Sequence, residues 1–329
     1  MGFLGDIGSA IMTPLYYLVS GILLVWHELF SLVLDPAWGG TWILSIVGLT
    51  VTIRTLLIPL FVKQIKSSRN MQLLQPQLKA LQQKYKHDRQ KLQQEQMKLF
   101  QETGTNPLAS CLPLLLQMPV FFALFRVIDH SSKYEVGDGN FQKGFITEEH
   151  ALQLSQAKFL GAKIADTFTG AEHVETRVLA AILVVMMCAT QFYTQRQLMA
   201  KNMPADALSG PYAQQQKLLL YILPFVFAVS GVVFPLGVLF YWVTSNLWTG
   251  GQQFYIIRNN PAPGTPAFKA KQERDARKGK DVAEDPIEAA KRAQIEQARP
   301  QRNQPSKKSR SQRNQGGQSN NSQQKGGDQ

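Results

Sequence analysis

Arg54 is the residue that points most directly to a functional site, because it is a charged side chain within an apolar segment. It lies near the centre of the otherwise uncharged run from Trp42 to Val62, WILSIVGLTVTIRTLLIPLFV. As a helix, these 21 residues would rise about 31 Å and cross a bilayer core of about 30 Å. An arginine at that depth costs about 2.5–3.5 kcal/mol on insertion scales. Either its side chain reaches back to the nearer membrane face, or it creates a hydrated, positively charged site inside the membrane.

Uncharged polar residues accompany Arg54 in the apolar segments. They are Thr50, Thr52, Gln117, Gln191, Tyr241, Trp242, Thr244, Ser245 and Asn246. Thr50 lies one helical turn before Arg54 and shares its face. Singly, each residue could form an interhelical hydrogen bond worth about 0.6 kcal/mol. Together with a buried cation they indicate a hydrated cavity, which would suit a transporter, a channel or a membrane chaperone.

The side chains that an enzyme needs are missing from these segments. A hydrolase requires a nucleophile with a base in reach, and a zinc enzyme commonly carries a His-Glu-x-x-His helix. The four segments 42–62, 108–128, 178–193 and 218–253 contain no His, Asp or Glu. Cys111 and Cys188 provide neither a disulfide framework nor a metal-binding spacing. We therefore expect no enzyme activity, no catalytic residue, no metal ligand and no cofactor.

The elements that must position Arg54 are apolar helices. Besides the run that holds Arg54, the apolar regions are Ile11–Leu34, Leu108–Ile128, Val178–Tyr193 and Leu218–Gln253. The last is long enough for two spans that turn at Phe234-Pro235-Leu236-Gly237. The first either spans the membrane or lies at its outer interface. Within it, His27 and Glu28 point to different helix faces, and we expect both at a surface or interface. These patterns predict an all-α polytopic membrane protein.

Charge predicts the orientation of the spans. Between residues 63 and 104, nine Lys/Arg face three acidic residues, whereas between 129 and 177 five face eight. The tail after Pro261 carries fifteen Lys/Arg and eight acidic residues. The positive-inside rule therefore places 63–104 and the C-terminus in the cytoplasm, and 129–177 outside.

The two basic cytoplasmic regions differ in pattern. In the first, Met71, Leu74, Leu78, Leu81 and Tyr85 recur at three- and four-residue steps, which predicts a helical hairpin that Pro76 must kink or restart. It could be a solvated structural hairpin or a docking arm. The tail should be disordered apart from a nascent helix at Ile287–Ala298. Its charge suits rRNA or anionic lipid headgroups, although it could serve only to keep the protein soluble.

Three motifs resemble one family of proteins. Residues 106–125, NPLASCLPLLLQMPVFFALF, and 234–253, FPLGVLFYWVTSNLWTGGQQ, are similar to signature spans of the YidC/Oxa/Alb family of membrane protein insertases. The run from Thr50 to Lys86 resembles that family's arginine-bearing span and the start of its cytoplasmic hairpin. The resemblance covers residues 11–258 and, because a large periplasmic domain is absent, matches the short Gram-positive type.

The resemblance implies five core transmembrane helices around a hydrophilic groove that is open to the cytoplasm, plus the cytoplasmic hairpin. It implies a fuel-free insertase and chaperone of the cell (inner) membrane. The implied groove residues are Arg54, Thr50, Gln117, Gln191 and Trp242, and the implied hydrophobic slide is Met118, Phe121 and Leu124. The implied partners are nascent membrane proteins, the Sec translocon, the signal recognition particle system, anionic lipids, and the ribosome through the tail and hairpin. The alternative is a small-solute transporter or channel built around Arg54.

The expected domains follow the chain in nine segments. They are an N-terminal interfacial or transmembrane helix (1–40), the arginine-bearing span (41–63), the cytoplasmic hairpin (64–105), a span (106–128), the extracytoplasmic loop (129–177), a span (178–195), a cytoplasmic loop (196–216), a transmembrane hairpin (217–258) and the disordered basic tail (259–329).

Overall fold

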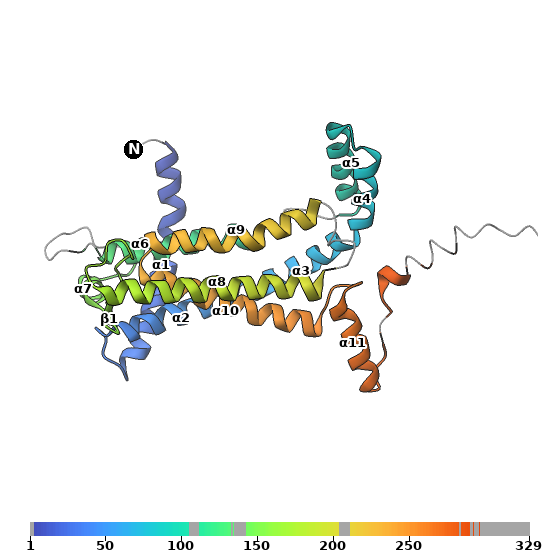
Figure 1. Cartoon of the computed structure of the whole chain (residues 1–329). Helices are drawn as coiled ribbons and strands as arrows, with labels where there is room; N and C mark the ends of the chain where they lie inside the picture. Colours follow the sequence, from blue (N-terminus) through green and yellow to red (C-terminus); the bar gives the residue numbers. More distant parts are fainter. Residues whose placement is uncertain are drawn as a thin grey trace, which may run out of the picture. The chain divides into compact units, whose positions relative to one another are not determined.

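The structure, a computed structural model, describes residues 3–104, 112–132, 134, 143–203, 211–282, 284–289, 292 and 296. Residues up to 285 belong to one compact unit that holds all the elements named below. The chain is mostly helical (Figure 1). The one described sheet has two strands, in which Lys158 pairs with Lys163 and Phe159 with Ala162, antiparallel.

The elements follow one another along the chain with short connections. They are α1 (Phe3–Ser31), α2 (Gly39–Leu56), α3 (Ile58–Leu73), α4 (Gln75–Lys84), α5 (Arg89–Glu102), α6 (Leu112–Ser132), α7 (Glu148–Gln156), β1 (Lys158–Phe159), β2 (Ala162–Lys163), α8 (Val174–Asn202), α9 (Pro211–Val233), α10 (Leu236–Asn259) and α11 (Pro266–Arg277).

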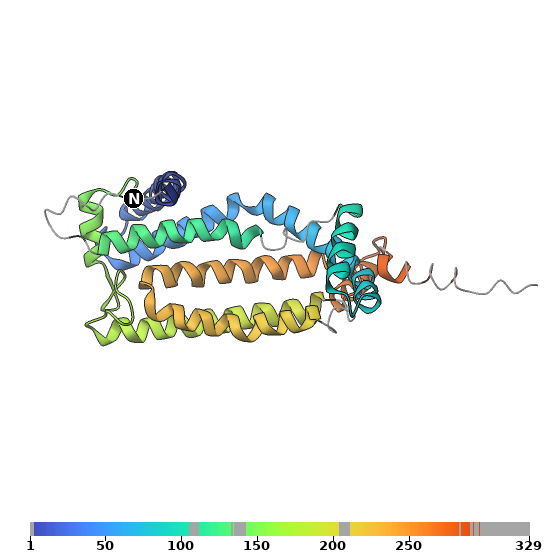
Figure 2. The same ribbon diagram turned by 90° about the horizontal axis from the view of Figure 1, so that it is seen from above.

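Helix α10 is the centre of the bundle. It packs against α2, α6 and α8, while α9 packs against α8. Figure 2 shows α10 between α6 on one side and the α8–α9 pair on the other. The largest fully buried side chains of the core include Trp42, Leu49, Leu124, Ile128 and Tyr241. Helix α1 crosses the long helices near one end of the bundle and is seen end-on in Figure 2.

The outer faces of α8 and α9 are strongly apolar. Val185 on α8 is 67% exposed and Phe225 on α9 is 70% exposed, and apolar neighbours surround both. Such a surface is unfavourable in water and is suited to lipid contact. Among the described residues, α2 and α8 are each long and apolar enough to cross a membrane.

The apolar run that holds Arg54 is broken in the structure. Helix α2 ends at Leu56 and α3 begins at Ile58, where the sequence alone suggested one uninterrupted span. Pro59 has no backbone N–H and cannot donate to the carbonyl of Thr55, so the helix is interrupted just before it. Arg54 consequently lies in the last turn of α2.

Residues 143–173, named here the cap, cover one end of the bundle. Ile146, Leu154 and Ile164 of the cap are at most 1% exposed and belong to the main core or line it. The backbone N–H of Gly237 donates to the Ile164 carbonyl at 3.0 Å, and that of Leu236 donates to the Asp166 carbonyl at 3.0 Å. The cap is therefore fastened to the start of α10.

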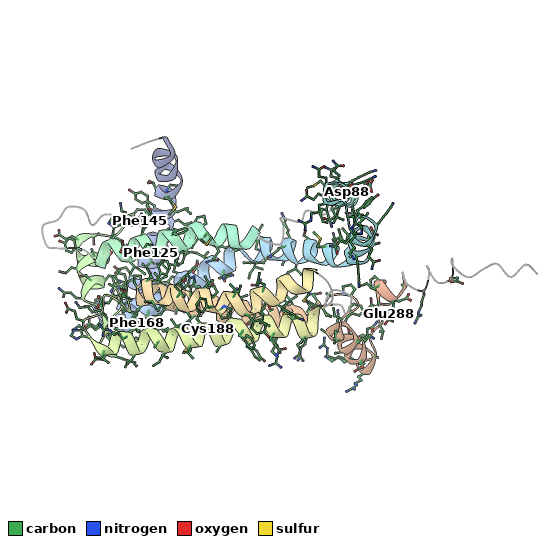
Figure 3. The ribbon with its side chains drawn as sticks, turned by 45° about the horizontal axis from the view of Figure 1, so that its top comes forward. Asp88, Phe125, Phe145, Phe168, Cys188 and Glu288 are labelled. Carbon is green, nitrogen blue, oxygen red and sulfur yellow. The ribbon has the colours of Figure 1, made fainter. Side chains whose placement is uncertain are left out.

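Side chains show the contrast between the two ends of the bundle. In Figure 3, Phe125, Phe145 and Phe168 lie toward the cap end, whereas Asp88 lies at the opposite end, in the α4–α5 hairpin. Asp88 precedes α5, and its carboxylate accepts a hydrogen bond from the Lys91 backbone N–H at 2.9 Å. This end of the unit carries α4, α5 and α11, in which Lys and Arg outnumber the acidic residues.

Two expectations from the sequence are wrong. Residues 266–277, assigned to the disordered tail, form α11, because Thr265 accepts a hydrogen bond from the Phe268 N–H at 3.2 Å and Pro266 pre-sets the first turn. His27, expected at a surface, is 1% exposed, because its ring packs 4.0 Å from that of Trp42. Its neighbour Glu28 is exposed, as expected. The nascent helix expected at Ile287–Ala298 lies largely outside the described residues.

Candidate functional site

Arg54 links the two helices that form the centre of the candidate site. Its guanidinium Nη2 donates a hydrogen bond to Ser245 Oγ, so the last turn of α2 is joined to the middle of α10. Arg54 is 9% exposed and Ser245 is 4% exposed. The Phe61 ring of α3 covers the guanidinium, with 5.6 Å between the guanidinium carbon and the ring centroid, a cation–π contact. The charge is therefore enclosed by α2, α3 and α10.

No acidic side chain pairs with Arg54 in the part of the chain that the structure describes. The described ion pairs join Lys98 to Glu102 on the hairpin, and His150 to Glu28 near the cap. The Nε atom of Arg54 is buried without a hydrogen-bond partner. Removing a charge from water without a counterion costs several kcal/mol, which a fold normally avoids. A neutral hydroxyl and one aromatic ring only partly offset that cost.

Helix α10 adds further buried polar atoms without partners among the described residues. They are Tyr241 Oη, Asn246 Nδ2, Trp248 Nε1 and Gln253 Oε1, which together we name the polar strip. Tyr241 is 1% exposed. Buried polar groups are almost always hydrogen-bonded to protein or water. The polar strip therefore indicates positions for water or for polar groups of a bound molecule.

Thr50, Gln117 and Gln191 occupy different positions relative to Arg54. Thr50 is buried, and its hydroxyl donates to the Ile46 carbonyl of its own helix at 2.7 Å. Gln117 on α6 and Gln191 on α8 are half-buried. Neither glutamine hydrogen-bonds to Arg54 among the described contacts. Among the described residues, Ser245 is the one that hydrogen-bonds to the guanidinium.

Trp242 brings the predicted groove and the predicted slide together. Its ring stacks on Phe121 of α6 at 4.8 Å between centroids with 4° between the planes. Phe227 and Phe234 meet the same ring edge-on at 5.5 and 5.3 Å. Trp242 thus lies in an aromatic cluster shared by α6, α9 and α10. Such pairs are worth about 0.5–1.5 kcal/mol beyond their buried area.

The three slide residues differ in accessibility. Met118 is 41% exposed, Phe121 is 5% exposed and Leu124 is fully buried. In this conformation Met118 is accessible from outside the protein, whereas Leu124 is not. Contact with Leu124 requires α6 to separate from the core.

Sequence reasoning missed Phe61, Trp248 and Gln253. A signal for Trp248 was present, because Tyr241, Ser245 and Trp248 recur at four- and three-residue steps along one helix, whereas Gln253 lies outside this pattern. Phe61 carried no such signal. Its contact with Arg54 depends on the break between α2 and α3.

Comparison with known proteins identifies the family. A family model described as "60Kd inner membrane protein" matches residues 33–263. A membrane protein insertase YidC of Streptomyces avermitilis is 43% identical over 265 residues, which are 78% of this chain and 60% of that protein. The YidC of Tropheryma whipplei strain TW08/27 is 33% identical over 285 residues, which are 82% of this chain and 90% of that protein.

A solved structure is also similar. The active YidC insertase crystal structure with the first transmembrane domain resolved is 26% identical, with a TM-score of 0.46, and the match covers 72% of this chain and 46% of that one. The relatives and the family match confirm the resemblance seen in the sequence motifs. The chain therefore belongs to the YidC/Oxa1 family of membrane protein insertases, which are non-enzymatic proteins of the cell membrane.

Proposed function

We propose that this chain inserts membrane proteins without a chemical fuel, and that Arg54 attracts acidic residues of the client. The observation that carries the proposal is a buried guanidinium whose described hydrogen-bond partner is a neutral hydroxyl. The Arg54–Ser245 bond already has a charged donor, but its acceptor is neutral, and a carboxylate acceptor adds the attraction between opposite charges. A client carboxylate can therefore displace Ser245 at a net gain. Arg54 would then hold the translocating tail part-way through the membrane.

The energy for transfer comes from the client and the membrane. The apolar helix of the client leaves the α6 slide of Met118, Phe121 and Leu124 and enters lipid, where its apolar surface is favoured. Each acidic tail residue that crosses the membrane gains about 2.3 kcal/mol per 100 mV of potential. No phosphate-binding motif is needed in this scheme, and the sequence contains none.

The groove must open for this to occur. Phe121 and Leu124 are buried, so α6 has to move away from α10 when a client helix arrives. The stacked pair of Phe121 and Trp242 is the natural point of separation, because a client's aromatic or aliphatic side chain can replace one ring of the stack. Water or client groups would meanwhile satisfy the polar strip together with Gln117 and Gln191.

The proposed orientation follows the charges. We place α3, the α4–α5 hairpin, α11 and the C-terminus in the cytoplasm, the cap outside, and α1 at the outer interface, since it crosses the long helices. The nine segments predicted from the sequence then keep their roles, apart from the helical start of the tail. The hairpin and the tail are the proposed contacts for the ribosome and anionic lipids, and the Sec translocon and signal recognition particle system are proposed partners.

Reconstitution tests the proposal. Liposomes that contain this chain alone should insert a small single- or double-spanning client, measured as a protease-protected fragment, and should show no ion conductance above empty liposomes. Protein-free liposomes and liposomes with the Arg54→Ala variant are the controls. Absence of insertion combined with conductance or solute flux would refute the insertase and favour a transporter or channel built around Arg54.

A further inference from the structure

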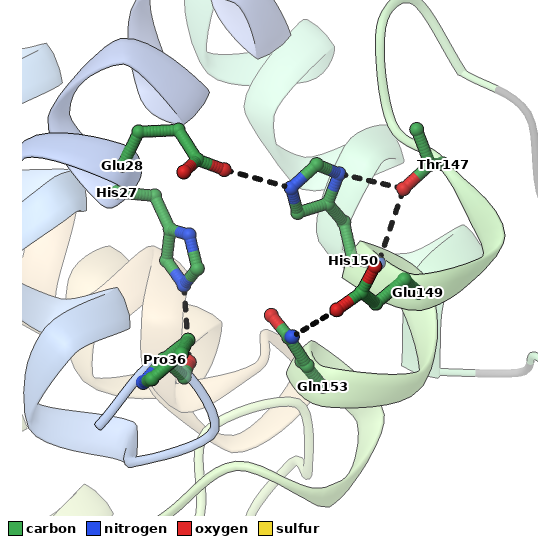
Figure 4. A network of polar contacts seen from close by, with 7 residues as sticks. All are labelled: His27, Glu28, Pro36, Thr147, Glu149, His150 and Gln153. Atoms are coloured by element: carbon green, nitrogen blue, oxygen red, sulfur yellow. Dashed lines mark hydrogen bonds and ion pairs between the residues drawn. The ribbon is translucent and has the colours of Figure 1, made fainter. Parts of the chain in front are cut away.

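Three side chains that could bind a metal converge where α1 meets the cap. They are His27 and Glu28 near the end of α1 and His150 on α7, and one ligand atom of each lies within 4.8 Å of the others. His150 Nε2 is 3.3 Å from a carboxylate oxygen of Glu28, although the two residues are 122 positions apart in the chain. Figure 4 shows both imidazoles and the carboxylate facing a common point.

The tautomer of His27 is set by its surroundings. Its Nε2 is 3.0 Å from the Pro36 carbonyl oxygen, which can only accept, so Nε2 carries the proton. Nδ1 is then unprotonated and carries a lone pair. This atom is buried, has no hydrogen-bond partner, and belongs to a residue that is 1% exposed. A buried imidazole lone pair fixed by a carbonyl on the opposite nitrogen is the arrangement of a metal-ligating histidine.

His150 is oriented in a similar way. Its Nδ1 is 2.8 Å from Thr147 Oγ, and the same oxygen accepts the His150 backbone N–H at 3.3 Å. In the tautomer that carries the proton on Nδ1, Thr147 accepts that proton and the Nε2 lone pair faces the Glu28 carboxylate, ready to bind a metal ion. In the other tautomer Thr147 donates to Nδ1 and His150 Nε2 donates to Glu28, so a metal ion would compete with a single proton for this nitrogen.

We propose that His27 Nδ1, His150 Nε2 and the Glu28 carboxylate bind a divalent transition metal ion, with Zn²⁺ the best match. Zinc favours nitrogen and carboxylate ligands at about 2.0–2.2 Å in a tetrahedron. The 3.3 Å between His150 and Glu28 is the ligand–ligand spacing that such bonds give. Glu28 has a side chain that is 69% exposed, so it can move to close the remaining gap. Water would complete the shell.

The proposed ion would tie α1 to the cap. His27 and Glu28 belong to α1 and His150 to α7, so without the ion these elements are joined at this point by the 3.3 Å contact between His150 and Glu28. Binding to the folded form alone raises stability in proportion to the logarithm of the free metal concentration. Zinc should therefore raise the melting temperature of the whole chain.

Zinc titration of the purified full-length chain in detergent micelles tests the proposal. We expect one saturable Zn²⁺ site, with affinity reduced by about tenfold or more in Glu28→Gln and in His150→Asn, since loss of supporting groups alone already costs 10–100-fold. His173→Asn is the matched control, because His173 is an exposed histidine just before α8. Its affinity for zinc should equal that of the parent.

A second measurement separates lost metal binding from misfolding. Without zinc, Glu28→Gln and His150→Asn should melt close to the parent temperature. Zinc should raise the melting temperature of the parent and of His173→Asn, and should not raise that of the two ligand variants. His27→Ala is avoided, because removing a ring packed against Trp42 could impair folding. Two results would overturn the site: no saturable zinc binding by the parent, or equal binding by the parent and the two ligand variants. His150 Nε2 would then be a hydrogen-bond donor to Glu28.

Discussion

At the scale of single residues, Arg54 could be identified from the sequence and its surroundings could not. A charged side chain in an apolar run is visible without a fold, because its insertion cost is large wherever it lies. Its partners, Ser245 and Phe61, depend on helix register and on the break at Pro59. The burial of Leu124 was likewise invisible, since an apolar residue in an apolar helix can face lipid or the core.

Accessibility along α6 leads to a prediction for client capture. A photoreactive residue at Met118, which is 41% exposed, should crosslink to a stalled nascent client more strongly than one at the fully buried Leu124. Crosslinking at Trp242 should be intermediate, because its ring is only partly covered. The measurement is the yield of client adduct in cells at each position. Equal yields at Met118 and Leu124 would mean that α6 has left the core while the client is bound.

At the scale of elements, long periodic patterns were predictable and short irregular ones were not. The apolar runs lie largely in α1, α2, the start of α3, α6, α8, α9 and α10, and the hairpin stripe runs from α3 through α4 to its C-cap, Tyr85. The cap gave no such pattern, because α7 has 9 residues and each strand has 2. Its order comes from tertiary contacts, such as Ile164 packing on the bundle, and these are not encoded in local sequence.

The cap's fit on α10 gives a prediction about packing. A Cβ at Gly237 would lie 3.0–3.2 Å from side-chain atoms of Ile128, Ile164 and Ile46, whereas one at Gly251 of the same helix would meet nothing within 4 Å. Gly237→Leu should lower the stability by about 1–3 kcal/mol through overpacking, and Gly251→Leu should not. The melting temperature in detergent measures both. Equal melting of the two variants would show that the cap does not rest tightly on α10.

At the scale of the whole molecule, charge is the organising property. The basic hairpin and α11 lie at one end of the bundle (Figure 1), and the cap, with four acidic residues and three Lys, lies at the other. Net charge and its asymmetry could be read from the sequence, and so could the all-α membrane class. The exposed apolar faces of α8 and α9 agree with that class, because they would otherwise face water.

The C-terminal segment 286–329 gives a prediction about ribosomes. It carries nine Lys/Arg and three acidic residues, and it belongs to a different unit from the bundle. Its removal should weaken ribosome binding while client insertion after translation continues. Phosphate contacts release counterions, so the tail-dependent part should fall steeply between about 50 and 200 mM salt.

Cosedimentation with ribosomes, with and without the segment, measures the effect. Truncation after Asp285 retains α11 and the hydrogen bond from the Gly264 N–H to the Asp285 carboxylate at 2.7 Å, so the folded unit is kept. Identical ribosome binding by both forms, or a tail contribution that salt does not change, would leave the segment with a solubilising or lipid-surface role.

The central claim is that the buried charge of Arg54 attracts the acidic tail of a client, and one insertion series tests it most directly. The series compares the parent, Arg54→Ala, Arg54→Lys and Arg126→Ala, which removes an exposed arginine from α6. Each is assayed with a client whose tail is acidic and with the same client whose tail acids are changed to amides.

Insertion of the acidic client should fall about tenfold or more in Arg54→Ala, since a charge-assisted hydrogen bond of about 1.5–3 kcal/mol is lost. Arg54→Lys should retain much of the activity, because it keeps the charge. Arg126→Ala should match the parent, and the amide client should respond little. Normal insertion of the acidic client by Arg54→Ala would contradict the account.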